Sequence, residues 1–333
     1  MTIKNLFSIK KFARKAYSMI EMSLLILIMG ILFGGAYQGF NIYYETHLAS
    51  ARTLTQNSIV SRVKNLGFWY EATHEDSLEK IENHEGKNIS MWLDRNGQQL
   101  IKNNAYGAQN TLKEKFNYDP NNIFDNSGPI YYANGIGGLP SLNFKNTNSS
   151  SKFLVIDPGF KYSKEDITIF AVVRFKNFTN NAVIFDRVCL KNSGGATYDE
   201  TLAVDSCKPF ISARVNVLGY PNLLIQSGEE SSLKSTSNTS FSLKNGAPYI
   251  LTFERIFNQS ISLYQNGNLV SSTPEDLGEI NFPPIKIGRG ATDRNVDSDF
   301  DLSEFIMIYG KLKQENKMEI ESYLSKKYSI KLN

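Results

Sequence analysis

Histidine and cysteine are scarce in this sequence. Its 333 residues include three histidines, all within the first 84 positions, and two cysteines. Beyond residue 84 the chain therefore has no imidazole to activate a serine or cysteine nucleophile, and it has no Gly-x-Ser-x-Gly motif. These absences exclude the common nucleophilic hydrolases for that part of the chain. No basic stripe with interleaved aromatic residues is present either, so nothing in the sequence indicates nucleic-acid binding.

Charge is absent from residues 22–40. At about 1.5 Å per residue, a helix of this length extends roughly 28 Å, which matches the hydrocarbon core of a bilayer. An ordinary secretory signal fits less well, because the run exceeds about 15 residues and no Ala-x-Ala-like cleavage site follows it. The leader, residues 1–16, carries five basic residues and no acid. The positive-inside rule keeps such a flank in the cytoplasm, which predicts a single-pass protein whose remainder is exported.

One carboxylate, Glu21, lies at the edge of this uncharged run. A charge there is costly unless something neutralises it, so such a residue indicates function. Residues 16–21, with the sequence AYSMIE, resemble the processing site of type IV pilins and type II secretion pseudopilins, although Gly is usual in that family where Ala16 stands. The resemblance implies that a prepilin peptidase cleaves between Ala16 and Tyr17 and that the new N-terminus is methylated. It also implies that Glu21 pairs with the N-terminal amine of a neighbouring subunit in the bacterial inner membrane. The alternative is an ordinary signal anchor with an incidental glutamate.

Apolar residues recur at roughly helical spacing past residue 40, so we predict that the helix continues to about Asn65, before Gly67. This divides the chain into a basic leader (1–16), a transmembrane and stalk helix (17–66), a polar connector (67–88) and a β-sandwich domain (89–333). The connector holds six acids and two histidines. Their spacing fits no known metal-ligand pattern, so we expect this segment to be solvated.

From residue 89, short apolar runs alternate with Gly, Asn, Ser and Pro clusters, which is typical of an all-β sandwich. Twelve strands are predicted, at 90–94, 129–133, 141–144, 153–156, 166–175, 182–185, 210–217, 222–226, 248–255, 260–265, 284–287 and 300–309. Residues 167–173 are largely apolar at alternate and intervening positions, so that strand is expected to be buried on both faces. Asn266-Gly267 predicts a tight hairpin.

Several of these segments carry a second resemblance. Residues 91–94 (MWLD) and 169–174 (IFAVVR), with the closing run 302–309 (LSEFIMIY) and a helix over 313–327, are similar to bacterial concanavalin A-like, or laminin G-like, jelly rolls. The resemblance implies a jelly-roll sandwich that follows the long N-terminal helix and ends in a C-terminal helix, with Glu304 as a structural acid. Lectins, adhesion modules and glycosidases share this architecture, so the fold does not define the function.

The two cysteines, Cys189 and Cys207, lie in a Gly- and Ser-rich loop between two predicted strands. An oxidising compartment favours a disulfide between them, which would contribute roughly 3 kcal/mol in the chain-entropy model. The alternative is two unpaired thiols.

Acidic residues gather before and within the last predicted strand. Asp299, Asp301 and Glu304 have the form D-x-D-x-x-E, close to the E-x-D-x-x-E of laminarinase-like glycosidases. The first position differs and the motif lies in the last strand, so we predict no catalysis. Asp293, Asp297, Asp299 and Asp301 offer hard oxygen ligands for a calcium ion. We favour the simpler interpretation, a solvated strand end.

These features predict an exported, non-enzymatic minor pilin or pseudopilin that assembles through its helix and displays a β-sandwich binding domain. The expected partners are other pilin-like subunits, the prepilin peptidase, the inner membrane, and a glycan or surface ligand. No cofactor other than calcium is expected. Aromatic residues that could stack on sugars are Tyr131, Tyr132, Tyr198 and Tyr220. The alternatives are a membrane-anchored binding module that enters no filament and, less favoured, a tethered glycosidase.

Overall fold

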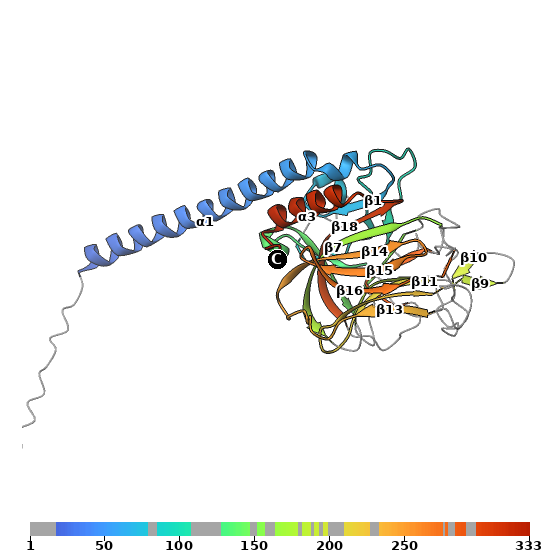
Figure 1. Ribbon diagram of the computed structural model, residues 1–333. Helices are drawn as coiled ribbons and strands as arrows, with labels where there is room; N and C mark the ends of the chain where they lie inside the picture. The colour runs from blue at the N-terminus through green and yellow to red at the C-terminus, as the bar shows by residue number, and fades with distance from the viewer. Residues whose placement is uncertain are drawn as a thin grey trace, which may run out of the picture. The chain divides into compact units, whose positions relative to one another are not determined.

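The computed structural model describes residues 18–78, 85–107, 128–146, 152–156, 164–178, 182–187, 190–192, 196–198, 210–226, 233–275, 277–278, 284–290 and 298–333. The chain forms two compact units, Met1–His47 and Leu48–Asn333. The first contains most of a long helix, and the second contains a sandwich of two antiparallel sheets with a C-terminal helix (Figure 1). This confirms the predicted fold class.

The N-terminal helix α1 (Met19–Gln56) begins with a capping box. The Ser18 amide donates to Glu21 Oε2 (2.8 Å), and the Glu21 amide donates to Ser18 Oγ (3.2 Å). Two N–H groups at the start of the helix are satisfied in this way. The large apolar side chains from Met19 to Tyr43 are 46–91% exposed. Among the described residues, α1 is the helix that is long and apolar enough to cross a membrane.

α1 ends at Gln56, earlier than the predicted end near Asn65. The Asn57 side chain donates to the Thr53 carbonyl (3.0 Å). Ser58 then takes an extended conformation (φ −68°, ψ 153°) and precedes the short 3₁₀ helix η1 (Ile59–Arg62). Asn and Ser side chains compete with helical backbone bonds. The apolar spacing therefore runs on past residue 56 while the α-helix does not.

The first sheet has the strand order β16-β15-β14-β7-β18-β5-β4, with β1 also paired to β18. Its strands are β1 (Leu66–Glu71), β4 (Ile130–Tyr132), β5 (Ser141–Asn146), β7 (Ile167–Phe178), β14 (Pro248–Ile256), β15 (Ser260–Gln265), β16 (Asn268–Pro274) and β18 (Ser298–Tyr309). The long strand β18 lies at its centre and pairs with β7 along most of its length.

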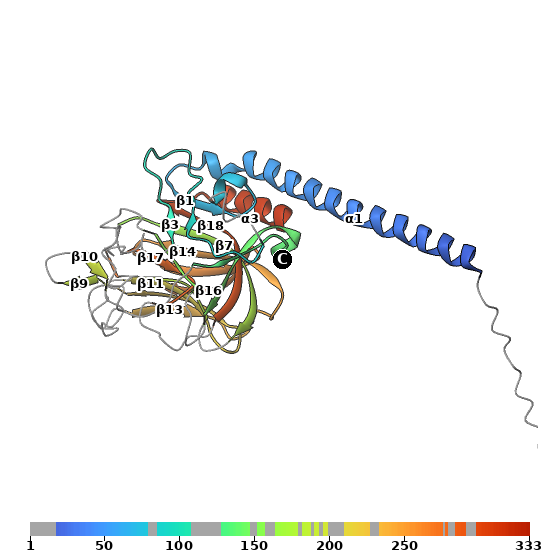
Figure 2. The same cartoon turned by 180° about the vertical axis from the view of Figure 1, so that it is seen from behind.

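The second sheet has the order β13-β12-β11-β8-β17-β6-β3-β2, and several of its strands are labelled in Figure 2. Its strands are β2 (Met91–Trp92), β3 (Ala105–Tyr106), β6 (Leu154–Ile156), β8 (Ala182–Arg187), β11 (Phe210–Val215), β12 (Pro221–Gln226), β13 (Leu233–Ser237) and β17 (Ile285–Ile287). A separate hairpin pairs β9 (Leu190–Asn192) with β10 (Ala196–Tyr198).

One hydrophobic core lies between the sheets, with aromatic rings from both of them in contact, for example Phe185 with Phe253 and Phe305. Every predicted strand overlaps a strand of the structure, whereas β1, β3, β13, β16 and the β9–β10 hairpin lie outside the twelve predicted ranges. Residues 167–173 of β7 are all buried, as expected. The predicted hairpin is also confirmed, because Asn266 (φ 50°) and Gly267 (φ 84°) both have the positive φ of a type I′ turn.

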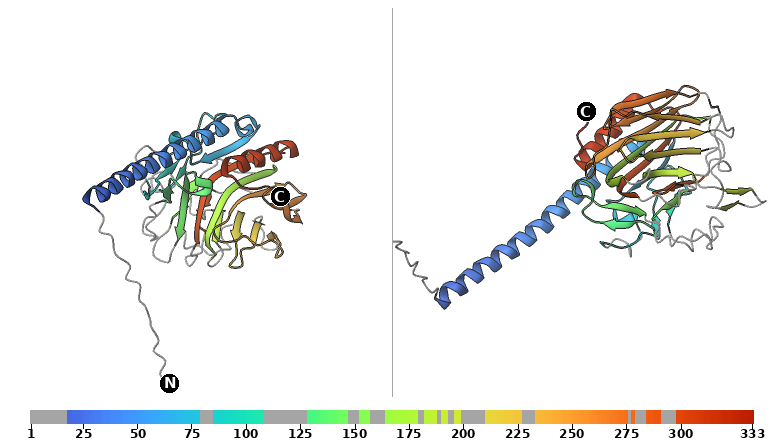
Figure 3. Two further views of the ribbon diagram at one scale, coloured as in Figure 1. Left: turned by 90° about the vertical axis from the view of Figure 1, so that its left-hand side faces the viewer. Right: turned by 90° about the horizontal axis from the view of Figure 1, so that it is seen from below.

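The helix α3 (Gln314–Tyr328) lies against the outer face of the first sheet (Figure 3), which confirms the helix predicted over 313–327. Thr252 Oγ1 donates to Glu321 Oε1 (2.9 Å). Lys317 Nζ lies 3.3 Å from Glu254 Oε2 and 3.1 Å from the centroid of the Tyr264 ring. This cover explains why β7 is buried on both faces.

The prediction of a polar connector at residues 67–88 is wrong, because the start of this segment is a strand of the sandwich. β1 pairs with residues 304–308 of β18, beside β5, which pairs with residues 298–302. Phe68 and Tyr70 belong to the core. The acids of this segment suggested exposure to solvent, but three consecutive aromatic residues, Phe68-Trp69-Tyr70, have a stronger preference for a strand.

Candidate functional site

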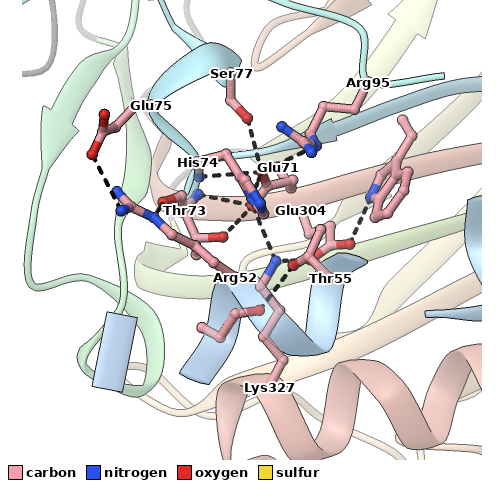
Figure 4. A network of polar contacts seen from close by, with 12 residues as sticks. Arg52, Thr55, Glu71, Thr73, His74, Glu75, Ser77, Arg95, Glu304 and Lys327 are labelled. Carbon is pink, nitrogen blue, oxygen red and sulfur yellow. Dashed lines mark hydrogen bonds and ion pairs between the residues drawn. The ribbon is translucent and has the colours of Figure 1, made fainter. Parts of the chain in front are cut away.

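Three charged side chains from different elements meet in the interior of the second unit. Glu71 ends β1, Glu304 lies in β18, and Lys327 lies in the last turn of α3. Lys327 Nζ is 3.1 Å from Glu71 Oε2 and 2.9 Å from Glu304 Oε2, and all three side chains are fully buried. We call these residues the buried ion cluster; Figure 4 shows them with their surroundings.

Glu71 accepts hydrogen bonds from the segment that follows it. The Thr73 amide (2.9 Å) and the Thr73 hydroxyl donate to Oε2, and the Ser77 hydroxyl donates to Oε1 (2.8 Å). His74 Nδ1 lies 2.8 Å from Oε1, and the Arg95 guanidinium lies 3.5 Å from the same oxygen. The carboxylate thus organises the turn after β1, including the short helix η2 (Glu75–Ser77).

Glu304 is held by donors from two elements, β1 and α3. Trp69 Nε1 donates to Oε1 (2.7 Å), Tyr323 OH donates to the same oxygen (2.8 Å), and Tyr328 OH donates to Oε2 (2.9 Å). Thr55, in the last turn of α1, lies 3.1 Å from Tyr323 OH. A continuous polar network therefore joins the end of α1 to β1, β18 and α3. Glu304 is a structural acid, as the jelly-roll resemblance implied.

Two pKa effects follow from this burial. Burial alone would raise the pKa of Glu71, but the Lys327 ammonium, together with the hydrogen bonds of His74 and Thr73, outweighs it and holds the pKa well below the ordinary value. Burial and the nearby carboxylates raise the pKa of Tyr323 and Tyr328 well above the usual value. Tyr323 and Tyr328 therefore act as hydrogen-bond donors, and Glu71 acts as an acceptor. With every carboxylate oxygen of the cluster occupied, the arrangement stabilises the fold and has no open position for a substrate.

The lowered pKa of Glu71 predicts a pH-dependent stability. Its ionised form is favoured in the folded state, so the stabilisation is fully present above the unfolded-state pKa of about 4.3 and is lost as pH falls toward the folded-state value. Urea unfolding measured between neutral and acidic pH should show this loss. In Glu71→Gln the loss below the ordinary carboxyl pKa should be smaller, and an unchanged pH slope in that variant would contradict the assignment.

Several predicted site residues, Ala16, Tyr17, Cys189, Cys207, Asp293 and Asp297, lie outside the described residues. Prepilin cleavage and the disulfide therefore stay predictions. Glu21 is described; it is exposed and completes the capping box of α1. That bond gives Glu21 a local structural role that the sequence analysis did not include, although the S-x-x-E spacing of a capping box was visible in residues 18–21.

The two described acids of the proposed calcium site have protein partners. Asp301 is fully buried and accepts from Arg174 Nη2 (2.6 Å) and Nε (3.0 Å), and Lys176 Nζ is 3.0 Å away. Asn143 Nδ2 donates to both Asp299 (2.8 Å) and Asp301 (2.9 Å). Two cations already neutralise Asp301, so a calcium ion there would have to displace them. Among the described residues, no group of three or more His, Cys, Asp or Glu is placed to hold a metal.

The carboxylates with the spacing of a glycosidase motif are likewise not assembled as a catalytic group. Asp301 and Glu304 are both fully buried and have separate sets of partners. A substrate could not reach either of them in this arrangement.

The aromatic residues considered for sugar stacking are not all accessible. Tyr131 is buried in the core, and Tyr132 is half-buried with Lys176 Nζ 4.6 Å from its ring centroid. Tyr220 is half-buried, and the side chain of Tyr198 is outside what the structure describes. Tyr131 was therefore a wrong choice, because its position in β4 points it between the sheets.

Sequence reasoning also missed the partners of Glu304. Lys327 lies on the same face of α3 as the buried residues Ile320 and Leu324. A lysine in an apolar helix stripe indicates a buried counter-charge, and this signal could have found it.

No protein-family model matches this chain, and no curated protein matches it. Solved structures do match. The botulinum neurotoxin serotype G binding domain is 13% identical with a TM-score of 0.48, covering 79% of this chain and 51% of that one. The binding domain of Paraclostridial Mosquitocidal Protein 1 is 13% identical with a TM-score of 0.49, covering 78% and 52%. The receptor binding domain of botulinum neurotoxin D is 14% identical with a TM-score of 0.49, covering 81% and 54%. This chain spans about half the length of each. Because these TM-scores are below 0.5, we draw no functional conclusion from these structural similarities.

Proposed function

We propose that this chain is an exported, membrane-anchored display protein, in which α1 spans a membrane and the sandwich is a non-enzymatic binding domain. The observation that carries this proposal is the apolar surface of α1. Residues 22–40 contain no charge, and their large apolar side chains are exposed in the chain. A surface of this size needs lipid or other helices to cover it.

The finer form of the proposal is a minor pilin or pseudopilin of a bacterial inner membrane. Residues 16–21 support it through their resemblance to a prepilin processing site, with Glu21 as the assembly carboxylate. The partners would be other pilin-like subunits and the prepilin peptidase. The competing proposal is an anchored binding module outside any filament, which does not need Glu21.

The ligand of the sandwich is proposed to be a glycan or another surface component. A binding role is favoured over hydrolysis because Asp301 and Glu304 are buried with protein partners. A calcium site would now depend mainly on Asp293, Asp297 and Asp299, and it stays a prediction.

The mature N-terminus tests the proposal. In cells that contain a prepilin peptidase, mass spectrometry of the purified protein should show a chain that begins at a methylated Tyr17. Ala16→Gly should speed this processing, because Gly is the usual residue there in the family. An intact Met1 terminus would rule out the pilin form while leaving the anchor possible.

The anchor itself is tested by extraction. The protein should stay in the membrane fraction under alkaline carbonate, and Ile31→Lys with Leu32→Lys should release it, because a charge at the centre of a span opposes insertion. Release of the unmodified chain by carbonate would contradict the anchor.

A further inference from the structure

The loop between β2 and β3, residues 93–104, has two adjacent and strongly exposed aliphatic side chains, Leu100 and Ile101, which we call the loop tip. Leu100 is 103% exposed and Ile101 is 84% exposed. Among the described residues beyond α1, no other large apolar side chains are as exposed as these two. Single exposed apolar side chains are common, but an adjacent pair this exposed requires an explanation.

The loop is held in place at its base by hydrogen bonds. Asp94 Oδ1 accepts from the amides of Trp69 (2.9 Å) and Asn96 (2.9 Å). Asn96 Nδ2 donates to the carbonyl of Leu66 (2.6 Å), at the start of β1. Gln98 Nε2 donates to the carbonyl of Val63 (2.7 Å). The tip is therefore presented by an ordered scaffold, so little conformational entropy is lost when it binds.

The surroundings of the tip are basic. Arg62 and Lys64 flank Val63, whose carbonyl holds the loop, and Lys102 follows Ile101 directly. All three are exposed, and the Lys102 ammonium also donates to the carbonyl of Asn96. Residues 57–65 and 95–104 contain no acid. The remaining cation, Arg95, faces the carboxylate of Glu71.

We propose that Leu100 and Ile101 insert into the surface of a lipid membrane with anionic headgroups, while Arg62, Lys64 and Lys102 contact those headgroups. A stable protein interface buries about 800 Å² per partner. Two protruding side chains among Gln and Asn residues offer too small an apolar area to form the core of such an interface. A bilayer accepts aliphatic side chains individually, without a matching pocket, and attracts neighbouring cations.

We propose that the loop contacts a second membrane, not the one that α1 spans. This step rests on the proposed anchoring of α1. About 24 Å of helix separates the end of the uncharged run from the end of α1, because residues 41–56 rise about 1.5 Å each. The β2–β3 loop is bonded to residues that follow this stretch.

The test uses the full chain in nanodiscs of phosphatidylcholine, mixed with separate vesicles of phosphatidylcholine and phosphatidylglycerol. The chain should capture these vesicles in flotation, and Leu100→Ser with Ile101→Ser should reduce capture about tenfold or more. Arg62→Gln with Lys64→Gln should weaken capture and its dependence on salt. Vesicles of phosphatidylcholine alone should be captured less well.

A matched control is available in the turn between β11 and β12. Val217 (55% exposed) and Leu218 (64% exposed) are also adjacent and apolar, and residues 215–220 carry no charge. Val217→Ser with Leu218→Ser should leave capture unchanged.

Equal capture by the Leu100→Ser, Ile101→Ser variant would overturn the proposal, and so would equal loss in the control. Concentration-dependent self-association abolished by the loop variant, without vesicle capture, would assign the tip to a second copy instead. A chain that fails to enter nanodiscs would count against the anchor, not against the loop.

Discussion

Replacing Lys327 with methionine is expected to lower the free energy of unfolding of the sandwich by about 3–5 kcal/mol. The ammonium is the shared counter-charge of Glu71 and Glu304, and all three side chains are fully buried. Removing it takes the shared counter-charge from two carboxylates in a low-dielectric interior, where their remaining hydrogen bonds compensate only in part, whereas methionine fills a similar volume. The loss should exceed what the packing change alone would cause.

Tryptophan fluorescence provides the measurement. The chain has two tryptophans, Trp69 and Trp92, and both are buried in the sandwich. Urea unfolding of the full chain in mild detergent, followed at these residues, therefore reports on the sandwich and not on the exposed part of α1. The neighbouring Lys326 is exposed on the same helix, and Lys326→Met should change stability by less than about 0.5 kcal/mol.

A second variant separates the charge from the packing. In Lys327→Met with Glu304→Gln, one uncompensated carboxylate is gone, and the amide can still accept from Trp69 and Tyr323. The double variant should recover part of the stability lost in Lys327→Met. If Lys327→Met and Lys326→Met were equally mild, the cluster would not have the role assigned to it.

The contrast between β18 and β1 shows what sequence reasoning can reach. The apolar run at residues 300–309 and its resemblance to the closing strand of a jelly roll were enough to place β18, and the same resemblance placed the closing helix. β1 also has a run of strand-forming residues, Phe68-Trp69-Tyr70, but the acids around it led us to predict a polar connector there. Its pairing with residues 304–308 joins positions more than two hundred residues apart in the chain. Periodicity contains no information about such long-range pairs.

The buried ion cluster was less predictable than the fold for the same reason. Glu304 could be identified as a structural acid from the resemblance of its strand. Its donor Trp69 is 235 residues away in sequence, and Lys327 belongs to a helix whose contact with the sheet depends on the whole sandwich. Glu21 is the opposite case, because its hydrogen-bond partner Ser18 is three residues away and the capping pattern is local.

Glu21→Gln is expected to reduce incorporation of the protein into filaments about tenfold or more, while the chain still folds and inserts into the membrane. The proposed partner, the N-terminal amine of a neighbouring subunit, would lose its counter-charge in an environment of low dielectric constant. Glutamine keeps an oxygen that can accept from the Ser18 amide, so the capping box survives. The variant therefore removes the charge and preserves the start of the helix.

Ser18→Ala is the matched opposite. It removes the hydroxyl that accepts from the Glu21 amide, at a cost of about 1 kcal/mol to the helix end, but leaves the carboxylate charged. Co-purification with filaments, measured in cells that contain the assembly machinery, should be lost in Glu21→Gln and retained in Ser18→Ala. The reverse pattern would show that Glu21 acts as a helix cap. Unchanged co-purification in both variants would favour an anchored module that needs no assembly carboxylate.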